Sequence, residues 1–183
     1  MNRKLLAALA IGTVVSACAS NPPTIPPVAE VDLQRFMGDW YVIAHVPSYP
    51  ERDAWNAVES YRLDEEGRIR TTFRFRRGGF EAPLETMEPV GRVVPGTNNA
   101  VWGMQFVWPI KAEYVIVDLS PDYTSSIVGR SKRDYLWIMA RTPSLPDAEY
   151  AALVEKTRAL GYDTSKLRKV PQRWPETAAD ARR

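Results

Sequence analysis

The chain has 183 residues, and its 24 Lys and Arg residues nearly balance its 22 Asp and Glu residues. Because the basic residues are spread along the sequence and follow no motif, this composition excludes a nucleic-acid-binding surface. One Cys and one His exclude an internal disulfide and the His- and Cys-rich sites that hold transition metals, so we expect no metal and no cofactor.

Residues 1–17 have the layout of a secretory signal peptide. Arg3 and Lys4 precede an apolar run over residues 5–15, which is too short to span a membrane as a helix. The segment ends in V-S-A-C at Cys18, which resembles the lipobox of bacterial lipoproteins. That resemblance implies cleavage before Cys18, a diacylglyceryl group on its thiol and acyl chains such as palmitate at the new amino terminus. The alternative is an ordinary signal peptide followed by a chance Cys.

The residues after the Cys suggest a location. Ala19, in place of Asp, implies by the same resemblance an outer-membrane lipoprotein of a Gram-negative envelope, facing the periplasm. Residues 18–30 are rich in Pro, which favours an extended tether between lipid and domain. We expect one folded domain over residues 31–172 and a flexible tail over residues 173–183.

The middle of the chain predicts a series of short strands. In residues 68–76, Arg side chains alternate with Ile69, Thr71, Phe73 and Phe75, the period of a strand with one buried face. Two architectures fit such a series, a sandwich and an up-and-down barrel, and a closed barrel of eight strands has no free edge. Pro89 indicates an edge or a bulge within its strand. The predicted strands are 40–47, 54–63, 68–76, 85–94, 100–108, 113–119, 125–130 and 134–141.

One helix is expected after the last strand. Ser144 is a candidate N-cap, Pro146 lies in the expected first turn, and Gly161 is a natural C-terminal stop. Apolar residues at helical spacing between them predict one buried stripe, packed on the outside of the strands. Residues 166–170 are expected to add pairing at an edge.

Three short motifs in order resemble those of the lipocalins. Gly38-Asp39-Trp40 matches the G-x-W motif, Asp122-Tyr123 matches the D-Y at a late turn, and Arg141 matches the Arg near the end of the eighth strand. Residues 100–173 are most similar to the bacterial lipocalins, outer-membrane lipoproteins related to apolipoprotein D. The resemblance implies an all-β fold, an eight-stranded antiparallel up-and-down barrel with one C-terminal α-helix outside it.

The family also implies structural roles for these residues. Trp40 is expected to point into the closed end of the barrel, with the guanidinium of Arg141 across its ring in a cation–π contact. Gly38 lets the chain turn into the strand, because it has no side chain in the way.

The parity set by Trp40 predicts which side chains face the interior. The strands would then enclose an apolar, aromatic space that suits an acyl chain, and the resemblance implies a fatty acid or a lysophospholipid as ligand. Packing in a filled core is the alternative for each residue, and a one-residue bulge would reverse a strand. The expected cavity lining comprises Ala57, Glu59, Ile69, Phe73, Trp102, Met104, Phe106, Tyr114, Ile116, Tyr135 and Trp137; Val42, Ala44, Val46, Tyr61, Leu63, Thr71, Phe75, Ile127 and Met139 are also expected to face inward.

Glu59 is unusual in this set. An inward carboxylate in an apolar barrel needs a partner, such as a cationic head group or a Tyr hydroxyl, or becomes neutral. The alternative is a local register shift that sends Glu59 to solvent.

No catalytic constellation is apparent. His45 is expected to point outward, opposite Trp40, and the sequence has no G-x-S-x-G motif and no Gly-rich phosphate loop. We therefore expect a membrane-tethered protein that binds, stores or transfers a small hydrophobic ligand and is not an enzyme. The alternatives are an enzyme on a lipid-like substrate, with Glu59 as its acid, and a structural envelope protein with a filled barrel. The sequence allows a monomer or a homodimer through an exposed aromatic such as Trp55.

Overall fold

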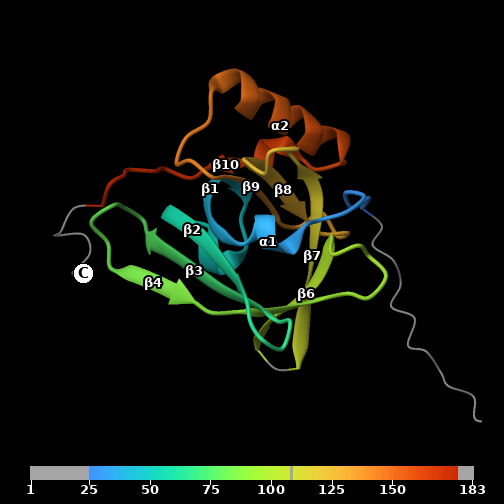
Figure 1. The fold of residues 1–183 in the computed structure, drawn as a ribbon. Coiled ribbons are helices and arrows are strands. Elements are labelled where there is room, and N and C mark those ends of the chain that lie inside the picture. The colour runs from blue at the N-terminus through green and yellow to red at the C-terminus, as the bar shows by residue number, and fades with distance from the viewer. Residues whose placement is uncertain (1–24, 108, 177–183) are drawn as a thin grey trace, which may run out of the picture.

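The structure is a computed structural model that describes residues 25–107 and 109–176; the expected signal segment and Cys18 lie outside these residues. Its strands form one antiparallel sheet, which closes because β1 pairs with both β2 and β9 (Figure 1). The strands are β1 (Gly38–Val46), β2 (Ala54–Leu63), β3 (Ile69–Arg77), β4 (Leu84–Met87), β5 (Val90–Val93), β6 (Val101–Val107), β7 (Ile110–Leu119), β8 (Ser125–Gly129), β9 (Leu136–Ala140) and β10 (Arg168–Lys169). The helices are α1 (Leu33–Phe36), the 3₁₀ turn η1 (Tyr49–Glu51), α2 (Asp147–Ala159) and the 3₁₀ turn η2 (Thr164–Lys166).

The eight-stranded barrel expected from the sequence is confirmed, with one strand broken in two. β4 and β5 occupy a single position beside β3, and they are separated at Glu88 and Pro89. Pro89 has no N–H to donate to a ladder, which accounts for the break. The short β10 pairs with β1 at Ala44 and His45. This is the pairing at an edge that was expected for residues 166–170. Residue 108, at the end of one expected strand, lies outside the described residues.

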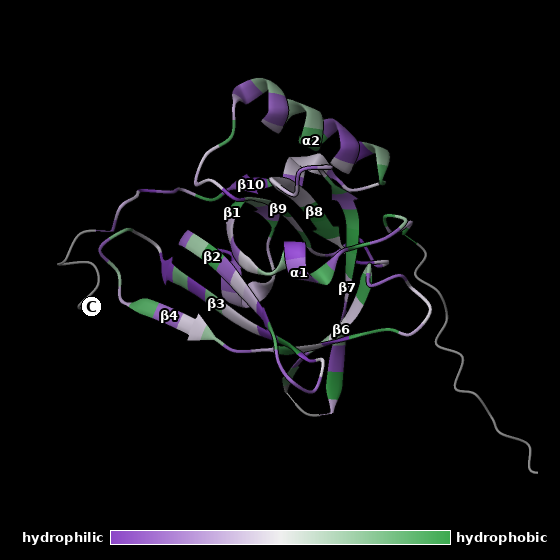
Figure 2. Ribbon diagram, viewed as in Figure 1, coloured by the Kyte–Doolittle hydropathy of each residue, from purple (hydrophilic) through white to green (hydrophobic). Residues whose placement is uncertain are grey.

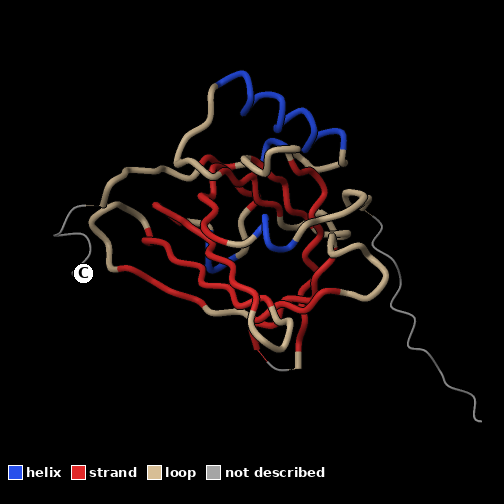
Figure 3. The backbone as a smooth tube through the Cα atoms, in the orientation of Figure 1, coloured by secondary structure: helices blue, strands red, loops and turns tan. Residues whose placement is uncertain are grey.

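Helix α2 packs on the outer surface of the barrel, as predicted. Leu153 and Tyr162, just beyond the helix, join a cluster with Ile43, Leu136 and Ile138 of β1 and β9. Figure 2 shows hydrophilic and hydrophobic bands along α2, and the tube in Figure 3 shows the helix lying along one side of the barrel. The helix therefore buries one apolar face against the barrel, and its other face is polar.

The predicted start of α2 is wrong by two residues. The N-cap position is held by Pro146, and Ser144 lies outside the helix, where its carbonyl accepts a hydrogen bond from Thr142 Oγ1 at 2.7 Å. Asp147 and Glu149 in the first turn place negative charge at the helix N-terminus, which stabilises it without a capping side chain. Gly161, with φ of +86°, follows the helix as expected.

The expected extended tether and the expected flexible tail both contact the barrel over their described parts. Ile25, within the predicted tether, is fully buried in the cluster beneath α2, and Val28 N donates to Ile116 O at 2.9 Å. Arg173 N, in the predicted tail, donates to Asn56 Oδ1 at 2.7 Å. Trp55, proposed from the sequence as an exposed aromatic, is half-buried and packs edge-on against Phe80, with ring centroids 4.7 Å apart.

Candidate ligand-binding cavity

Trp40 and Arg141 close one end of the barrel. The guanidinium carbon of Arg141 lies 3.9 Å from the centre of the Trp40 ring, and Trp40 Nε1 donates to Phe36 O at 2.8 Å. Phe36, at the end of α1, packs at a tilt against Trp40 and edge-on against Trp102, with ring centroids 4.9 and 5.3 Å apart. All three side chains are fully buried, so they form a plug at this end of the barrel.

The other two motifs hold that plug in place. Arg141 donates from Nη1 to Asp39 O at 2.8 Å and from Nη2 to Arg35 O at 2.7 Å. In the turn after β7, Asp122 Oδ1 accepts from Thr124 Oγ1 at 2.8 Å, and Tyr123 takes a positive φ of 63°. The Tyr123 hydroxyl then accepts from Asp32 N, the N-cap of α1, at 2.9 Å. The late turn thus anchors the helix that covers the closed end.

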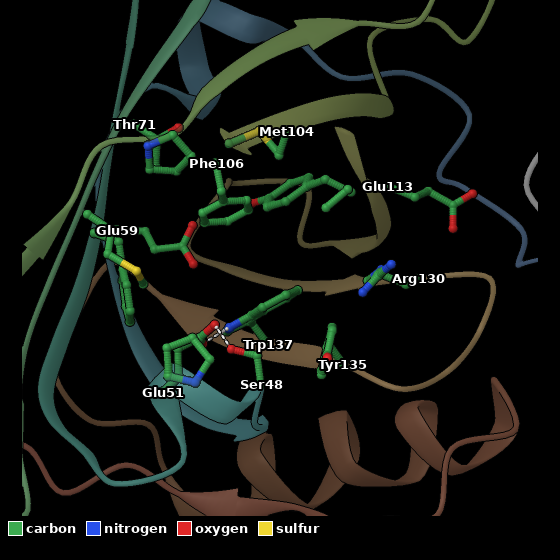
Figure 4. Close-up of a pocket in the computed structure, with 16 residues that line it drawn as sticks. Ser48, Glu51, Glu59, Thr71, Met104, Phe106, Glu113, Arg130, Tyr135 and Trp137 are labelled. Carbon is green, nitrogen blue, oxygen red and sulfur yellow. Dashed lines mark hydrogen bonds between the residues drawn. The ribbon is translucent and has the colours of Figure 1, made fainter. Parts of the chain in front are cut away.

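The opposite end of the barrel contains a cavity of about 220 Å³. Its wall is mostly apolar and aromatic, with a few carboxyl and hydroxyl groups (Figure 4). Phe106 at its edge is 54% exposed, and nearby Ile110 is 71% exposed, so the mouth carries an apolar rim. The lining residues are Ser48, Pro50, Glu51, Glu59, Thr71, Phe73, Met87, Pro89, Met104, Phe106, Ala112, Glu113, Tyr114, Arg130, Tyr135 and Trp137.

The residues predicted to line a cavity divide into two groups. Glu59, Phe73, Met104, Phe106, Tyr114, Tyr135 and Trp137 line it. Ala57, Ile69, Trp102 and Ile116 do not line it, and all four are fully buried in the packed core. Trp102 is fully buried and stacks on Tyr114 with ring centroids 4.8 Å apart, so it packs behind a residue of the cavity lining.

The inward or outward orientation predicted for some side chains is wrong in β1 and in β8. The β1–β9 register shifts between Val42 and Ala44, so Val42 belongs to the inner core while Ala44 and Val46 face the α2 side. The added residue at this shift reverses the alternation beyond it. Ile127 of β8 also lies on the outer side, because it pairs with Ile138, while its neighbour Val128 pairs with Trp137 and belongs to the inner core.

The register shift between β1 and β9 also determines which way His45 points. It pairs with Trp137, a cavity residue, and it is fully buried, so its predicted outward orientation is wrong. Neither of its ring nitrogens has a hydrogen-bond partner among the described residues. His45 Nδ1 lies 3.8 Å from Glu51 Oε2.

Glu59 faces the interior and not the solvent. It is 8% exposed, and its carboxylate accepts a hydrogen bond from the Tyr61 hydroxyl, which lies 2.6 Å from the hydroxyl of Tyr114. Burial in an apolar wall, reinforced by the negative charge of Glu51, raises the pKa of Glu59 to about 8. Burial and the charge of Glu59 likewise raise the pKa of Tyr114 well above its usual value. The floor of the cavity is therefore a hydrogen-bonded acid–phenol chain.

Glu51 is a second buried carboxylate at this site, which the sequence pattern did not reveal. It lies in η1, between β1 and β2, and is 5% exposed. Its oxygens accept from Ser48 Oγ at 2.6 Å and from Trp137 Nε1 at 2.7 Å, so two donors hold the carboxylate beside the cavity (Figure 4). Alternation identifies residues within strands, and a residue in a connection gives no such signal.

The rim carries two more charged groups that were not predicted. Glu113 accepts from Ser131 N at 2.6 Å and Ser131 Oγ at 2.8 Å. Arg130 lies over the Tyr135 ring at 4.9 Å and within 3.4 Å of Asp134. Thr71 Oγ1 and Arg130 Nε, both buried, have no hydrogen-bond partner within the described part of the chain.

Two further kinds of feature are absent from residues 25–107 and 109–176. No group of three or more His, Cys, Asp or Glu residues there is arranged to hold a metal ion. No helix in these ranges is both long and apolar enough to cross a membrane.

Comparison with known sequences and folds identifies relatives over most of the chain. Residues 31–172 match the lipocalin-like domain family. Temperature-induced lipocalin-1 of Arabidopsis thaliana is 31% identical over 157 residues, covering 79% of this chain and 81% of the relative. The outer membrane lipoprotein Blc of Vibrio cholerae is 26% identical and covers 87% of this chain and 93% of its own length.

Among solved structures, insecticyanin from the tobacco hornworm Manduca sexta is similar, with a TM-score of 0.65 and 20% identity. The alignment covers 83% of this chain and 86% of insecticyanin. At this identity the likeness concerns the fold alone.

Proposed function

Because the chain belongs to the lipocalin-like family, we propose that it binds a small hydrophobic ligand, such as a fatty acid or a lysophospholipid, in the cavity at the open end of the barrel. The observation that carries this proposal is the cavity itself, walled by Phe73, Met104, Phe106 and Trp137 and open to solvent on one side. An apolar pocket with a few polar groups is the usual form of a site for such ligands. The acyl chain would lie along these side chains.

The proposed place of action is the outer membrane of a bacterial envelope, facing the periplasm. The lipobox-like V-S-A-C at Cys18 supports acylation and membrane attachment, and relatives such as Blc of Vibrio cholerae are named outer membrane lipoproteins. Several acyl chains hold a protein firmly, at about 0.8 kcal/mol for each buried CH₂ group. A protein held in this way would store its ligand or pass it over a short distance.

A second candidate is an enzyme on a lipid-like substrate. The observation in its favour is Glu59, because a carboxyl group with a pKa of about 8 is protonated at neutral pH and has the property of a general acid. We place it second, since the family supports a binding role. The open cavity weighs against the third reading, a structural protein with a filled barrel.

The test is mass spectrometry of lipids that co-purify with the chain from residue 20 onward, which lacks Cys18 and so carries no acyl group of its own. The lipids are extracted under denaturing conditions and quantified per chain. We expect one single-chain amphiphile per molecule. An altered lipid released into the medium on incubation, with turnover, would favour the enzyme instead.

Two matched substitutions locate the ligand. Ala112→Trp fills the cavity, because Ala112 lines it, and we expect the co-purified lipid to be lost. Ala152→Trp adds the same side chain on the exposed face of α2 and should leave the lipid in place. Equal lipid content in the two variants would contradict binding in this cavity, and absence of any lipid from the parent chain, with no uptake of added lipid, would contradict the proposed function.

A further inference from the structure

The charges that face the cavity are unbalanced. Carboxylates come from three separate elements, while the guanidinium of Arg130 at the rim already lies 3.4 Å from Asp134. Within the described residues, neither Glu51 nor Glu59 forms an ion pair with a Lys or an Arg. Besides Glu59, the titratable and charged groups that line or border the cavity are Glu51 of η1, His45 of β1, Tyr61 of β2, Glu113 and Tyr114 of β7, Arg130 after β8 and Tyr135 before β9.

These two carboxylates lie in the same part of the cavity. Both line the cavity, and Figure 4 shows them on the same side of it. The negative charge of Glu51 contributes to the raised pKa of Glu59, as expected for two neighbouring acids. Glu59 is held from below by Tyr61, and Glu51 is held by Ser48 and Trp137. Among the described residues, the barrel thus fixes two acids that no Lys or Arg neutralises, and His45 is the one basic side chain within 4 Å of Glu51.

Aromatic rings border this acidic region. Trp137 lies 6.4 Å from the ring of Tyr114 and 6.4 Å from that of Tyr135, measured between ring centroids. Aromatic faces next to carboxylates are the surroundings that bind ammonium groups, because the negative face of each ring attracts a cation. Figure 4 shows Met104 and Phe106 across the cavity from Glu51 and Trp137, which leaves an apolar side for an alkyl chain.

We propose that the cavity selects single-chain amphiphiles that carry an ammonium group, which lies between Glu59 and Glu51 against Trp137, while the alkyl chain lies along Met104 and Phe106. This deepens the proposed function and rests on it, since it names the class of amphiphile. An anionic carboxylate head in the same position would face two acids. Two sources supply such an ammonium group: a long-chain amine and the head group of a zwitterionic lysophospholipid.

Protons provide a distinctive signature. An ammonium group binds the ionised form of Glu59, so its binding must release the proton that this acid holds at neutral pH. Affinity for the cation then rises with pH, by up to about tenfold per pH unit, until it levels off near pH 8. A carboxylate ligand would give the opposite slope, because it needs that proton for a shared hydrogen bond.

The experiment uses probes with matched twelve-carbon chains: dodecyltrimethylammonium and dodecanoate below their critical micelle concentrations, and dodecanol below its solubility limit. Binding to the chain from residue 20 is measured by calorimetry between about pH 6 and 9, in two buffers of different ionisation enthalpy to count protons. We expect the ammonium probe to bind at least about tenfold more tightly than dodecanoate near pH 8, with proton release. Dodecanol should bind with no pH dependence.

Glu59→Gln is the decisive variant, since it keeps the shape of the side chain and removes its charge. It should lose the preference for the ammonium probe and the proton release while still binding dodecanol. Glu65→Gln, at an exposed turn, is the matched control and should behave as the parent. Binding of lauroyl lysophosphatidylcholine is compared with binding of lauroyl lysophosphatidylglycerol to separate the two sources of the ammonium group. Tighter binding of the choline lipid points to a lysophospholipid as ligand. Equal, weak binding of both lipids points to a free long-chain amine.

Two results would count against different claims. Dodecanoate binding as tightly as the ammonium probe near pH 8 in the parent chain would overturn the cation preference and leave the cavity as a binding site. Failure of all three probes, dodecanol included, would overturn the proposed function itself. Unchanged selectivity in Glu59→Gln would show that the preference arises elsewhere in the chain.

Discussion

The two ends of the barrel use the same residue types to opposite effect. At the closed end, Trp40 is fully buried, donates to a backbone carbonyl and is covered by the guanidinium of Arg141. At the open end, Trp137 is half-buried, donates to the carboxylate of Glu51 and borders empty space. The surroundings therefore decide the role of each ring. Trp40 is part of a plug because its neighbours pack against it on all sides and bond its N–H group. Trp137 is part of a binding site because one side of its ring borders the cavity.

The largest effect should follow from truncating the closed-end ring. Trp40→Ala removes a fully buried side chain from contact with Phe36 and Arg141, and we expect it to lower the free energy of unfolding by about 3–5 kcal/mol. Trp137→Ala should cost less, because its ring already faces the cavity, but should weaken ligand binding. Urea unfolding and probe titration measure the two quantities. Equal stability losses would show that the two ends are not different in kind.

The next effect concerns pH and the floor of the cavity. The pKa of Glu59 is about 8 in the folded state, above its value of 4.5 in an unfolded chain. The folded protein therefore holds a proton that the unfolded chain loses, and the free energy of unfolding should fall as pH rises between about 5 and 8. The slope approaches about 1.4 kcal/mol per pH unit, and the whole change is on the order of 3 kcal/mol.

Glu59→Gln isolates this contribution, because the amide does not titrate. Its stability should change less than that of the parent over the same pH range, so the difference between the two curves gives the slope due to Glu59 alone. Urea unfolding at several pH values is the measurement. Parallel curves for parent and variant would mean that Glu59 holds no proton in the folded state.

The sequence predicted the strands well because their signals are local. The alternation of Arg with Ile69, Thr71, Phe73 and Phe75 defines β3 and its inner face, and Pro89 predicted the place where β4 and β5 separate. Both features depend on a single strand and its own period.

The site was harder to predict because it depends on register and on a connection. The bulge between Val42 and Ala44 carries no Gly or Pro, so nothing in that stretch indicates that His45 turns inward. Glu51 lies in a 3₁₀ turn, outside any periodic pattern. Alternation predicts whether a side chain faces the interior, but it does not predict how far along the barrel the side chain lies. For this reason Trp102 and Ile116 were predicted to line the cavity, although they pack in the core beneath it.

A smaller effect should follow from a conservative change in the plug. Arg141 donates to the carbonyls of Asp39, Arg35, Phe36 and Tyr123, a set that a single ammonium group does not span. Arg141→Lys should therefore lower the free energy of unfolding by about 2 kcal/mol while the affinity for ligand stays unchanged. Arg158→Lys, on the exposed face of α2, is the control and should change it by less than about 0.5 kcal/mol. A loss of ligand affinity in Arg141→Lys would show that the plug and the site are coupled.

The smallest effect tests how the chain enters the first strand. Gly38 has φ of +93°, and a Cβ atom there would lie 3.4 Å from Arg141 Nη1, an ordinary contact distance. The cost of Gly38→Ala should therefore come from the backbone, at about 1 kcal/mol. Gly78 and Gly79 provide the controls. Gly78 has a similar φ of +83° with open space around it, and Gly79 has no positive φ, so both are replaced by Ala for comparison. Thermal unfolding should give similar losses at residues 38 and 78 and almost none at 79; a much larger loss at 38 alone would mean that Arg141 tolerates no neighbour and that the plug, and not the turn, requires glycine.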